Sequence, residues 1–381
     1  MSPQRQKSVL MCLGAYNPLL HRGIARYAAE HRWHLQADMA VMPVIPWGWR
    51  GDGIVAYSNE RKELQRFLRG EISKNTPLVD TSLIHPETPR LRVVGDNRGV
   101  GQLAAEDFLA RGWRHFAWFT RQHHYIARLR QEGFTEVLVR QGHRCLSLTQ
   151  PLHFNVTTVN WPMMRRNLIR ALKSLQTPVA VFAFNDYDAA FLMDCCFAAG
   201  LRVPDDVGIL GVDDNDLVVN NTQVPLSSVR FDHERIGYEA AAALDQLMQG
   251  RKKPPPLTVI PPRGIAVRAS TDIFAVHHPA VRSALRFIQD NLGRSLGVTE
   301  IARASGLSCR TLETAFLKET TRSIHKEIMR MRIQTAKELL HNTTLPIEDI
   351  AAKTGFCHAP HFHRVFHQAE GKTPRTYRLN L

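Results

Sequence analysis

Histidine and cysteine side chains gather in one short stretch near the C-terminal end of the sequence. Residues 357–367 read CHAPHFHRVFH, which places four histidines and one cysteine on a short segment. Such side chains bind transition metals, and histidines three or four positions apart on a helix can approach one ion. Zinc sites usually add a Cys-x-x-Cys pair, which none of the 6 cysteines forms. We therefore expect neither a metal nor a cofactor.

Motifs of catalysis are missing from the sequence. It contains no G-x-S-x-G, H-E-x-x-H or phosphate-binding loop. The stretch 94–101, VGDNRGVG, precedes a helix pattern but lacks the G-x-G-x-x-G spacing of a dinucleotide site. Cysteines without paired spacing favour reduced thiols in the cytoplasm. We expect a cytoplasmic protein that is not an enzyme.

A second group of polar side chains follows apolar runs that read as strands. Asn185 and Asp186 follow the run 179–184, and Asp213 and Asp214 follow the run 207–211. Carboxylates, amides and the guanidinium of Arg130 can satisfy several adjacent hydroxyls of a sugar. Asn and Asp also cap helices, and the spacing alone leaves both interpretations open.

The elements that would position these side chains alternate along residues 8–271. Apolar runs separated by amphipathic segments predict a parallel sheet covered by helices, which binds ligands at the carboxyl ends of its strands. The run 8–13 fits a first strand better than a signal peptide, and no stretch is long enough to span a membrane. The expected strands are 8–13, 53–56, 77–79, 91–94, 115–119, 179–184, 207–211, 257–260 and 265–267, and the expected helices are 19–31, 60–68, 101–110 and 189–199.

The pattern changes after a break rich in basic residues and proline, RKKPPP at 251–256. We expect two domains, residues 1–274 and 275–381. The second has 16 Lys and Arg against 9 Asp and Glu, denser in positive charge than the rest of a chain whose net charge is +14. That balance indicates nucleic acid as a partner. Its apolar periodicity predicts only helices: one with the stripe 281–292, then 299–305, 309–317, 324–340, 347–353 and 358–368.

Two passages of this second domain share one design. In 298–308 a short helix stops at a glycine and Ser308 caps the next helix; 347–357 repeats this, with Cys357 at the cap. The second helices would bury Leu312 with Phe316, and Phe362 with Phe366. Helix, tight turn and helix form the unit whose second helix enters the major groove of DNA.

The tail, residues 278–380, resembles the AraC/XylS-type DNA-binding domain. The matching residues are Ile301-Ala302, Gly306-Leu307-Ser308, Leu312, Phe316, Arg332, Ala336, Leu339-Leu340, Ile350-Ala351, Gly355-Phe356, Phe362, Arg364-Val365-Phe366, Gly371, Thr373-Pro374 and Tyr377-Arg378. The resemblance implies a transcription regulator that binds double-stranded operator DNA through two helix-turn-helix units. Thr314, Thr321 and Cys357 depart from the family pattern. We expect DNA contacts from Ser308, Arg310, Thr311, Glu313 and Thr314 of the first unit, and from His358, Ala359, Pro360, His361, His363 and Arg364 of the second.

Residues 8–271 resemble the ligand domain of LacI-type regulators, which has the fold of type I periplasmic binding proteins. The matching passages are Asp96-Asn97, 130–134, 181–186, 203–213, 225–229 and 265–271, the last resembling a closing strand. The resemblance implies two α/β lobes with an effector between them. Carried over by position, Arg130, Asn185 and Asp213 would bind the ligand with Asp186 nearby, and Asn17 would face the same cleft.

A LacI-like sensor ahead of an AraC-like reader resembles sugar-operon activators. This implies a pentose effector, D-xylose first, together with a homodimer that works with RNA polymerase and has no membrane partner. Two alternatives stay open at this point: a regulator that responds to another sugar or represses, and a sugar-binding transport protein.

Overall fold

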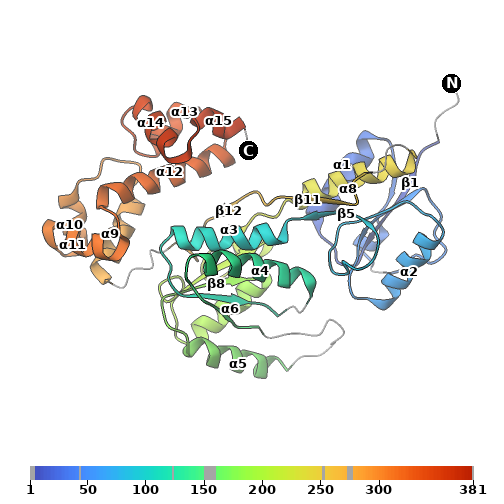
Figure 1. Cartoon of the computed structure of the whole chain (residues 1–381), viewed down its shortest axis with the longest axis horizontal. Helices are drawn as coiled ribbons and strands as arrows, with labels where there is room; N and C mark the ends of the chain where they lie inside the picture. Colours follow the sequence, from blue (N-terminus) through green and yellow to red (C-terminus); the bar gives the residue numbers. More distant parts are fainter. Residues whose placement is uncertain are drawn as a thin grey trace. The chain divides into compact units, whose positions relative to one another are not determined.

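The computed structural model describes residues 5–42, 44–121, 124–149, 160–250, 254–272 and 278–379 (Figure 1). The chain divides into two units, Met1–Asp272 and Ile273–Leu381. The domain boundary predicted between residues 274 and 275 lies outside the described residues, and so does the basic part of the predicted break at 251–253. Within the described ranges, no helix has the length and apolar character that crossing a membrane requires.

The first unit begins with a lobe built on a parallel six-stranded sheet, called lobe 1 here. Helices α1 and α8 cover one face of this sheet, and α2 covers the other. Residues Val9 to Leu13 of the first strand are all buried, as expected for a strand covered on both faces. The sheet order is β2 (His34–Gln36), β1 (Ser8–Leu13), β3 (Gly53–Tyr57), β4 (Leu78–Asp80), β5 (Leu91–Gly95) and β11 (Leu257–Ile260); the helices are α1 (Pro18–Glu30), α2 (Lys62–Ser73) and α8 (His233–Met248).

The second lobe, lobe 2, repeats this plan on another six-stranded sheet. Helices α5 and α6 pack on one face; on the other, the Phe134 ring of α4 meets Phe116 and Phe182, and the Phe108 ring of α3 packs against Phe134. Only the last strand is antiparallel to its neighbour. The order is β7 (Cys145–Ser147), β6 (Phe116–Phe119), β8 (Val179–Ala183), β9 (Val207–Val212), β10 (Ser227–Val229) and β12 (Ile265–Ala266); the helices are α3 (Asn97–Ala110), α4 (Tyr125–Arg140), α5 (Trp161–Lys173), α6 (Asp186–Ala198) and α7 (Asp216–Val219).

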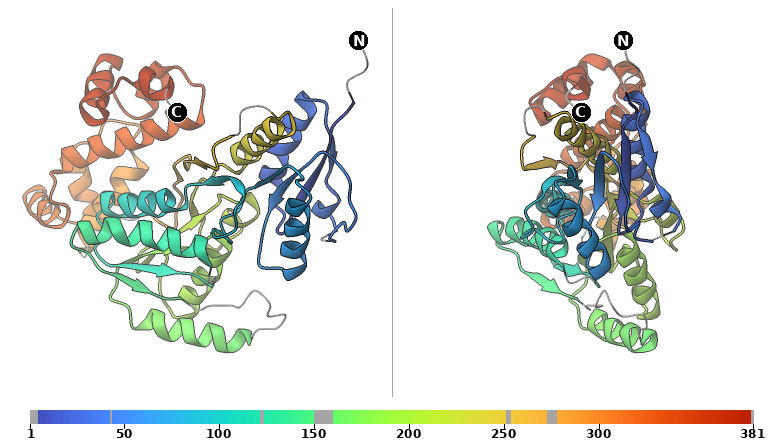
Figure 2. Two further views of the ribbon diagram at one scale, coloured as in Figure 1. Left: turned by 45° about the vertical axis from the view of Figure 1, so that its right-hand side comes forward. Right: turned by 90° about the vertical axis from the view of Figure 1, so that its right-hand side faces the viewer.

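The chain passes between the two lobes three times, after β5, after β10 and after β11 (Figure 2). The crossing segments hydrogen-bond to one another. The N–H of Asp96 donates to the carbonyl of Ile260 at 2.8 Å, and the N–H of Arg230 donates to the carbonyl of Gly264 at 2.8 Å. Three short connections of this kind make a hinge about which lobes can close.

The second unit is helical throughout its described residues. Its helices are α9 (Pro279–Asp290), α10 (Val298–Ser305), α11 (Cys309–Thr320), α12 (Ile324–Asn342), α13 (Ile347–Lys353), α14 (Ala359–Glu370) and α15 (Pro374–Leu379). Leu312 and Phe316 lie in one apolar cluster, and Phe362 and Phe366 lie in another, as predicted. The long helix α12 contributes to both clusters and so joins two helix-turn-helix units.

Buried Arg332 of α12 links these two units. Its Nε donates to the carbonyl of Leu292 at 3.2 Å and its Nη2 donates to that of Arg294 at 2.6 Å. The guanidinium also lies 5.7 Å from the ring centre of Phe356, in the turn of the second unit. One side chain therefore contacts the segment that precedes α10 and the turn of the second helix-turn-helix unit.

The predicted fold class is confirmed: a two-lobed α/β unit precedes an all-α unit with two helix-turn-helix motifs. The predicted starts of several helices are wrong. The helix predicted at 101–110 begins at Asn97 because the Asp96 side chain caps it, and the helix predicted at 189–199 begins at Asp186 because Asn185 caps it. The sequence pattern does not predict α4, α5, α8 or α15, and the passage 265–271 forms a strand only at its first two residues.

Candidate ligand cavity and DNA-reading helices

A cavity of about 730 Å³ is lined by residues of both lobes of the first unit. Four of the five predicted ligand residues line it: Asn17 from lobe 1, and Arg130, Asn185 and Asp213 from lobe 2. They come from the starts of α1 and α6, the first half of α4 and the loop after β9. The carboxyl ends of the parallel strands thus bring side chains together that lie far apart in the sequence.

Arg130 is the buried cation of the cavity, with 5% of its surface exposed. Its Nε donates to Asn97 Oδ1 at 2.9 Å, and its Nη1 donates to the carbonyl of Phe184. Its Cζ lies 4.8 Å from the ring centre of Phe184 and 5.2 Å from that of Phe231. Burial lowers the pKa of Arg130, and the Asp213 carboxylate opposes that shift. The guanidinium is therefore held in one orientation with donors left for a ligand.

The loop after β9 holds Asp213 in a strained conformation. Asp213 has φ 105° and Asp214 has φ 51°, in the left-handed region that side chains rarely adopt. The Asp213 carboxylate lies 3.2 Å from His233 Nε2, which belongs to lobe 1. Asp214 forms ion pairs with Arg230 at 3.1 Å and with Arg268 at 2.8 Å. Strain maintained by such contacts is typical of functional loops, and here it presents a carboxylate to the cavity.

Tyr57 of lobe 1 lies near the carboxylate of Asp213. It ends β3 and lines the cavity. Burial, and next the Asp213 carboxylate, raise the pKa of Tyr57 to about 12. The phenol therefore stays protonated and can donate a hydrogen bond to a hydroxyl ligand at neutral pH.

Asn17 and Asn185 each combine a helix cap with a place in the cavity lining. Asn17 Oδ1 accepts from the N–H groups of Leu19 and Leu20, and Asn185 Oδ1 accepts from the N–H of Asp188. Each residue therefore caps a helix and also lines the cavity. Capping uses the amide oxygen and leaves the NH₂ group as a donor.

Asp186 does not line the cavity. Its carboxylate accepts from Ser228 Oγ at 2.6 Å and from the N–H of Asn215 at 2.8 Å. Burial raises its pKa well above the ordinary value, and the Asp213 charge raises it further. Asp186 therefore lies behind the cavity wall, where it anchors the loop that carries Asp213.

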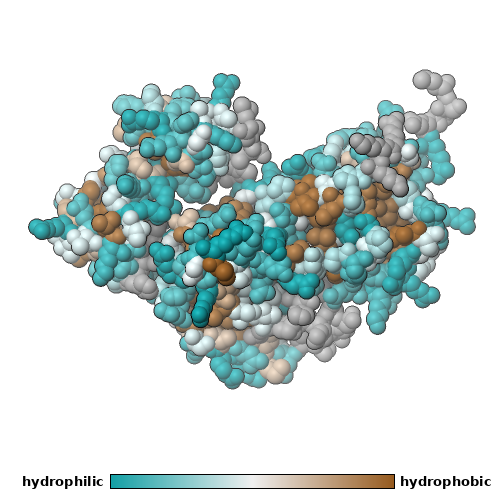
Figure 3. Space-filling view, viewed as in Figure 1, coloured by the Kyte–Doolittle hydropathy of each residue, from teal (hydrophilic) through white to brown (hydrophobic). Residues whose placement is uncertain are grey.

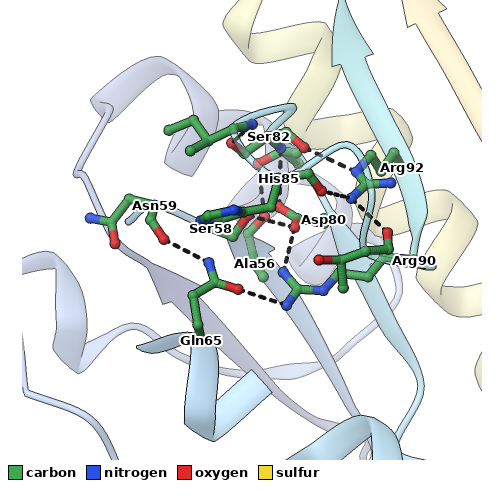
Figure 4. Close-up of polar contacts among 12 residues, drawn as sticks. Ala56, Ser58, Asn59, Gln65, Asp80, Ser82, His85, Arg90 and Arg92 are labelled. Carbon is green, nitrogen blue, oxygen red and sulfur yellow. Dashed lines mark hydrogen bonds and ion pairs between the residues drawn. The ribbon is translucent and has the colours of Figure 1, made fainter. Parts of the chain in front are cut away.

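A buried ion pair that the sequence analysis does not predict supports the lobe 1 wall (Figure 4). The side chains of Asp80 and Arg90 are both 0% exposed, with 2.9 Å between Oδ2 and Nη1. Asp80 also accepts from Ser58 Oγ at 2.7 Å and from the N–H of Ser82 at 3.1 Å, and Arg90 Nη2 donates to Gln65 at 2.9 Å. These bonds join the loops after β3 and β4.

Arg92 extends this network into the loop beside the cavity. Its Nε donates to the carbonyl of Ser82 at 3.2 Å, and its Nη2 donates to those of His85 and Thr88 (Figure 4). The same loop contributes Leu83 and Ile84 to the cavity lining. Arginines at alternate positions around an apolar strand are the one sequence signal that could have indicated this buried network.

The first candidate reader helix is α11. Ser308 Oγ accepts from the N–H of Thr311 at 3.2 Å, which confirms the predicted cap. Arg310, Thr311, Glu313 and Thr314 are exposed on the helix, opposite the buried pair Leu312 and Phe316. All five predicted contact residues of this unit are therefore accessible. Hydrophilic side chains cover most of the visible surface of the second unit (Figure 3).

The second candidate reader helix, α14, differs at its start. Its N-cap is His358 rather than the predicted Cys357, and no side chain caps it. The turn after Gly355 is one residue longer than the turn after Gly306, and this shifts the cap by one position. Pro360 lies in the first turn, as predicted. Ala359 is half-buried, and His358 is exposed.

The histidines of α14 divide into two groups. His361 packs against Phe356 and His363 against Phe362, with ring centres 5.6 and 5.9 Å apart, and both are half-buried. Arg364 is exposed, and so is His367, which the sequence analysis does not include among the contacts. Within the part of the chain that the structure describes, no three His, Cys, Asp or Glu side chains are grouped to hold a metal ion. Its six cysteines are free.

Comparisons with known proteins agree with this two-part architecture. Residues 105–271 match the family model of a periplasmic binding protein-like domain, and residues 301–380 match that of a helix-turn-helix domain. The fold and its reader helices define the class: the chain is a DNA-binding transcription regulator with a periplasmic-binding-protein-like sensor domain.

Within this class the chain is similar to xylose operon regulatory proteins. It is 28% identical to that of Haemophilus influenzae over 76% of this chain and 74% of the relative, and 25% identical to that of Escherichia coli K12 over 96% and 94%. A solved structure described as a xylose-binding transcription activator has a TM-score of 0.62 at 22% identity, with 98% of both chains covered. A cellobiose complex of a transcriptional regulator has a TM-score of 0.57 at 22% identity, covering 70% of this chain and 86% of that one.

Proposed function

We propose that this chain activates pentose catabolic genes in the cytoplasm and that D-xylose is its effector. The observation that carries the proposal is one chain with both parts: a cavity that the charged side chains of Arg130 and Asp213 line, and two exposed reader helices. The names of the relatives, which refer to a xylose operon, support the choice of sugar.

The proposed roles follow from the cavity. Arg130 donates to sugar hydroxyls, Asp213 accepts from them, and the amide groups of Asn17 and Asn185 donate from opposite lobes. Asp186 acts through the Asp213 loop rather than on the sugar. The proposed DNA contacts are Ser308, Arg310, Thr311, Glu313 and Thr314, and His358, Ala359, Pro360, His361, His363 and Arg364.

The proposed switch is closure of the lobes about their three crossing segments. A sugar that bonds to both lobes binds the closed state more tightly, so it shifts the population toward that state. In a homodimer this changes how the two DNA-binding domains reach neighbouring half-sites. RNA polymerase is then recruited beside them.

Calorimetric titration of the full chain with a panel of pentoses tests the sensor. We expect heat with D-xylose that is lost in Arg130→Ala, and no heat with any pentose would refute the sugar assignment. A footprint on selected DNA tests the readers. Protection that is unchanged in both Arg310→Ala and Arg364→Ala would count against the assigned helices.

The size of the cavity is a reason to test a larger sugar as a second candidate effector. Its volume of about 730 Å³ leaves room for a sugar larger than a pentose. Cellobiose therefore belongs in the same titration, beside the arabinose of the pentose panel. Tight binding of one of them, without heat from D-xylose, would support the proposed regulator but assign it a different effector.

A further inference from the structure

An apolar pair lies on the outward face of α11, among the polar residues proposed to read DNA. Leu317 is 56% exposed, and Thr314 is exposed one helical turn before it. Both lie opposite the buried Leu312 and Phe316. The Thr314 hydroxyl donates to the carbonyl of Arg310 at 3.0 Å. That bond occupies the hydroxyl within the helix and leaves the methyl group as the apolar part of Thr314, and Leu317 is its neighbour three residues along the same helix face.

Only one base offers a matching group in the major groove. Thymine carries a 5-methyl group there, whereas the other bases present hydrogen-bond donors and acceptors alone. We propose that Thr314 and Leu317 contact a thymine methyl, so that α11 requires thymine at a defined position. This inference rests on the proposed function, in which α11 enters the major groove.

The position follows from helix geometry. Arg310 and Leu317 lie seven residues apart, which is about 10 Å along a helix and roughly three base-pair steps of DNA. If Arg310 reads a guanine at one end of the half-site, the thymine lies about three base pairs away.

The second reader lacks this pair. Phe362 and Phe366 occupy on α14 the places that Leu312 and Phe316 occupy on α11. The residues that correspond to Thr314 and Leu317 are then Arg364 and His367, both polar and exposed. Dependence on a thymine methyl through this pair is therefore confined to the half of the site that α11 reads.

Replacement of thymine by deoxyuridine tests the contact because it removes only the methyl group. Binding sites are first selected from random DNA with the full chain, and each thymine is then replaced in turn. The wild type should lose affinity about fourfold at one or two positions of one half-site. Leu317→Ala should abolish that loss, and Thr314→Ser, which keeps the hydroxyl, should reduce it. The control Val139→Ala removes an exposed apolar side chain, 62% exposed on α4, and should change nothing.

Three outcomes would overturn the proposal. The loss of DNA affinity on replacement of thymine by deoxyuridine can be absent in the wild type. It can persist in both Leu317→Ala and Thr314→Ser, or it can disappear in Arg364→Ala instead. Selection that enriches no sequence at all would contradict the proposed DNA-binding function as well, so the two failures are distinguishable.

Discussion

Replacement of Arg130 by methionine tests the ligand cavity most sharply. Methionine keeps most of the side-chain length between the rings of Phe184 and Phe231 but removes every donor. In the wild type, Nε and one Nη1 N–H are bonded to Asn97 and Phe184. Among the described residues no acceptor is bonded to Nη2, so its two N–H groups, beside the second N–H of Nη1, can donate to a sugar.

The magnitude follows from the two donors of Nη2. A hydrogen bond that involves a charged group contributes about 1.5 kcal/mol or more, so two of them contribute about 3 kcal/mol. This corresponds to a rise in Kd of roughly a hundredfold. Arg130→Lys keeps the charge but not the planar fork, and we expect it to lose a large part of the affinity too.

The assay is calorimetric titration with the pentose that binds the wild type. Arg128→Met is the matched control, because Arg128 lies one half-turn earlier on α4 with 65% of its side chain exposed. Thermal unfolding of each variant separates lost affinity from lost folding. If folded Arg130→Met binds the sugar within about threefold of the wild type, Arg130 is not a ligand residue and the assigned cavity chemistry is wrong.

Three further predictions concern stability. Gly355→Ala should destabilise the second unit by more than about 3 kcal/mol in urea unfolding, because a Cβ there would overlap the carbonyl of Leu292; Gly306→Ala, with positive φ but open space, should cost only about 1–2 kcal/mol. Equal losses in the two variants would refute the crowding argument. Arg332→Met should cost about 2–3 kcal/mol and weaken DNA binding by the two readers together, and footprints that keep both half-sites would contradict its linking role. Asp186 has a raised pKa, so its protonated form favours folding and its stabilising effect declines as pH rises above the ordinary value of about 3.8. Asp186→Asn should therefore be less sensitive to pH from 5 upward than the wild type in thermal unfolding, and parallel pH profiles would contradict this.

Local patterns in the sequence predict much of the fold. Parallel strands covered on both faces are continuous apolar runs, so β1, β8 and β9 stand out from the sequence. The two helix-turn-helix units are also visible, because a glycine in the turn and an apolar pair at helical spacing are local signals. The one-residue difference between their turns is not visible in the sequence pattern. It moves the N-cap of the second unit from Cys357 to His358.

The sequence does not predict contacts between residues that lie far apart in the chain. The Asp80–Arg90 pair and the Asp186 anchor depend on how neighbouring strands end in space, which no periodicity reports. A residue such as Asn185 gives the same sequence signal whether it caps a helix or lines the cavity, so the sequence does not separate the two roles. The division between Asp213 in the cavity and Asp186 behind its wall likewise required the geometry of the loop after β9.

The central claim is that one ligand cavity controls one pair of DNA-reading helices. Its most direct test is the affinity of the full chain for its selected DNA site, measured with and without saturating D-xylose. We predict a change of about fivefold or more, within the usual range of coupling between two sites, and no change in Arg130→Met. Equal affinity in both conditions, for a wild-type chain that binds the sugar, would contradict the account.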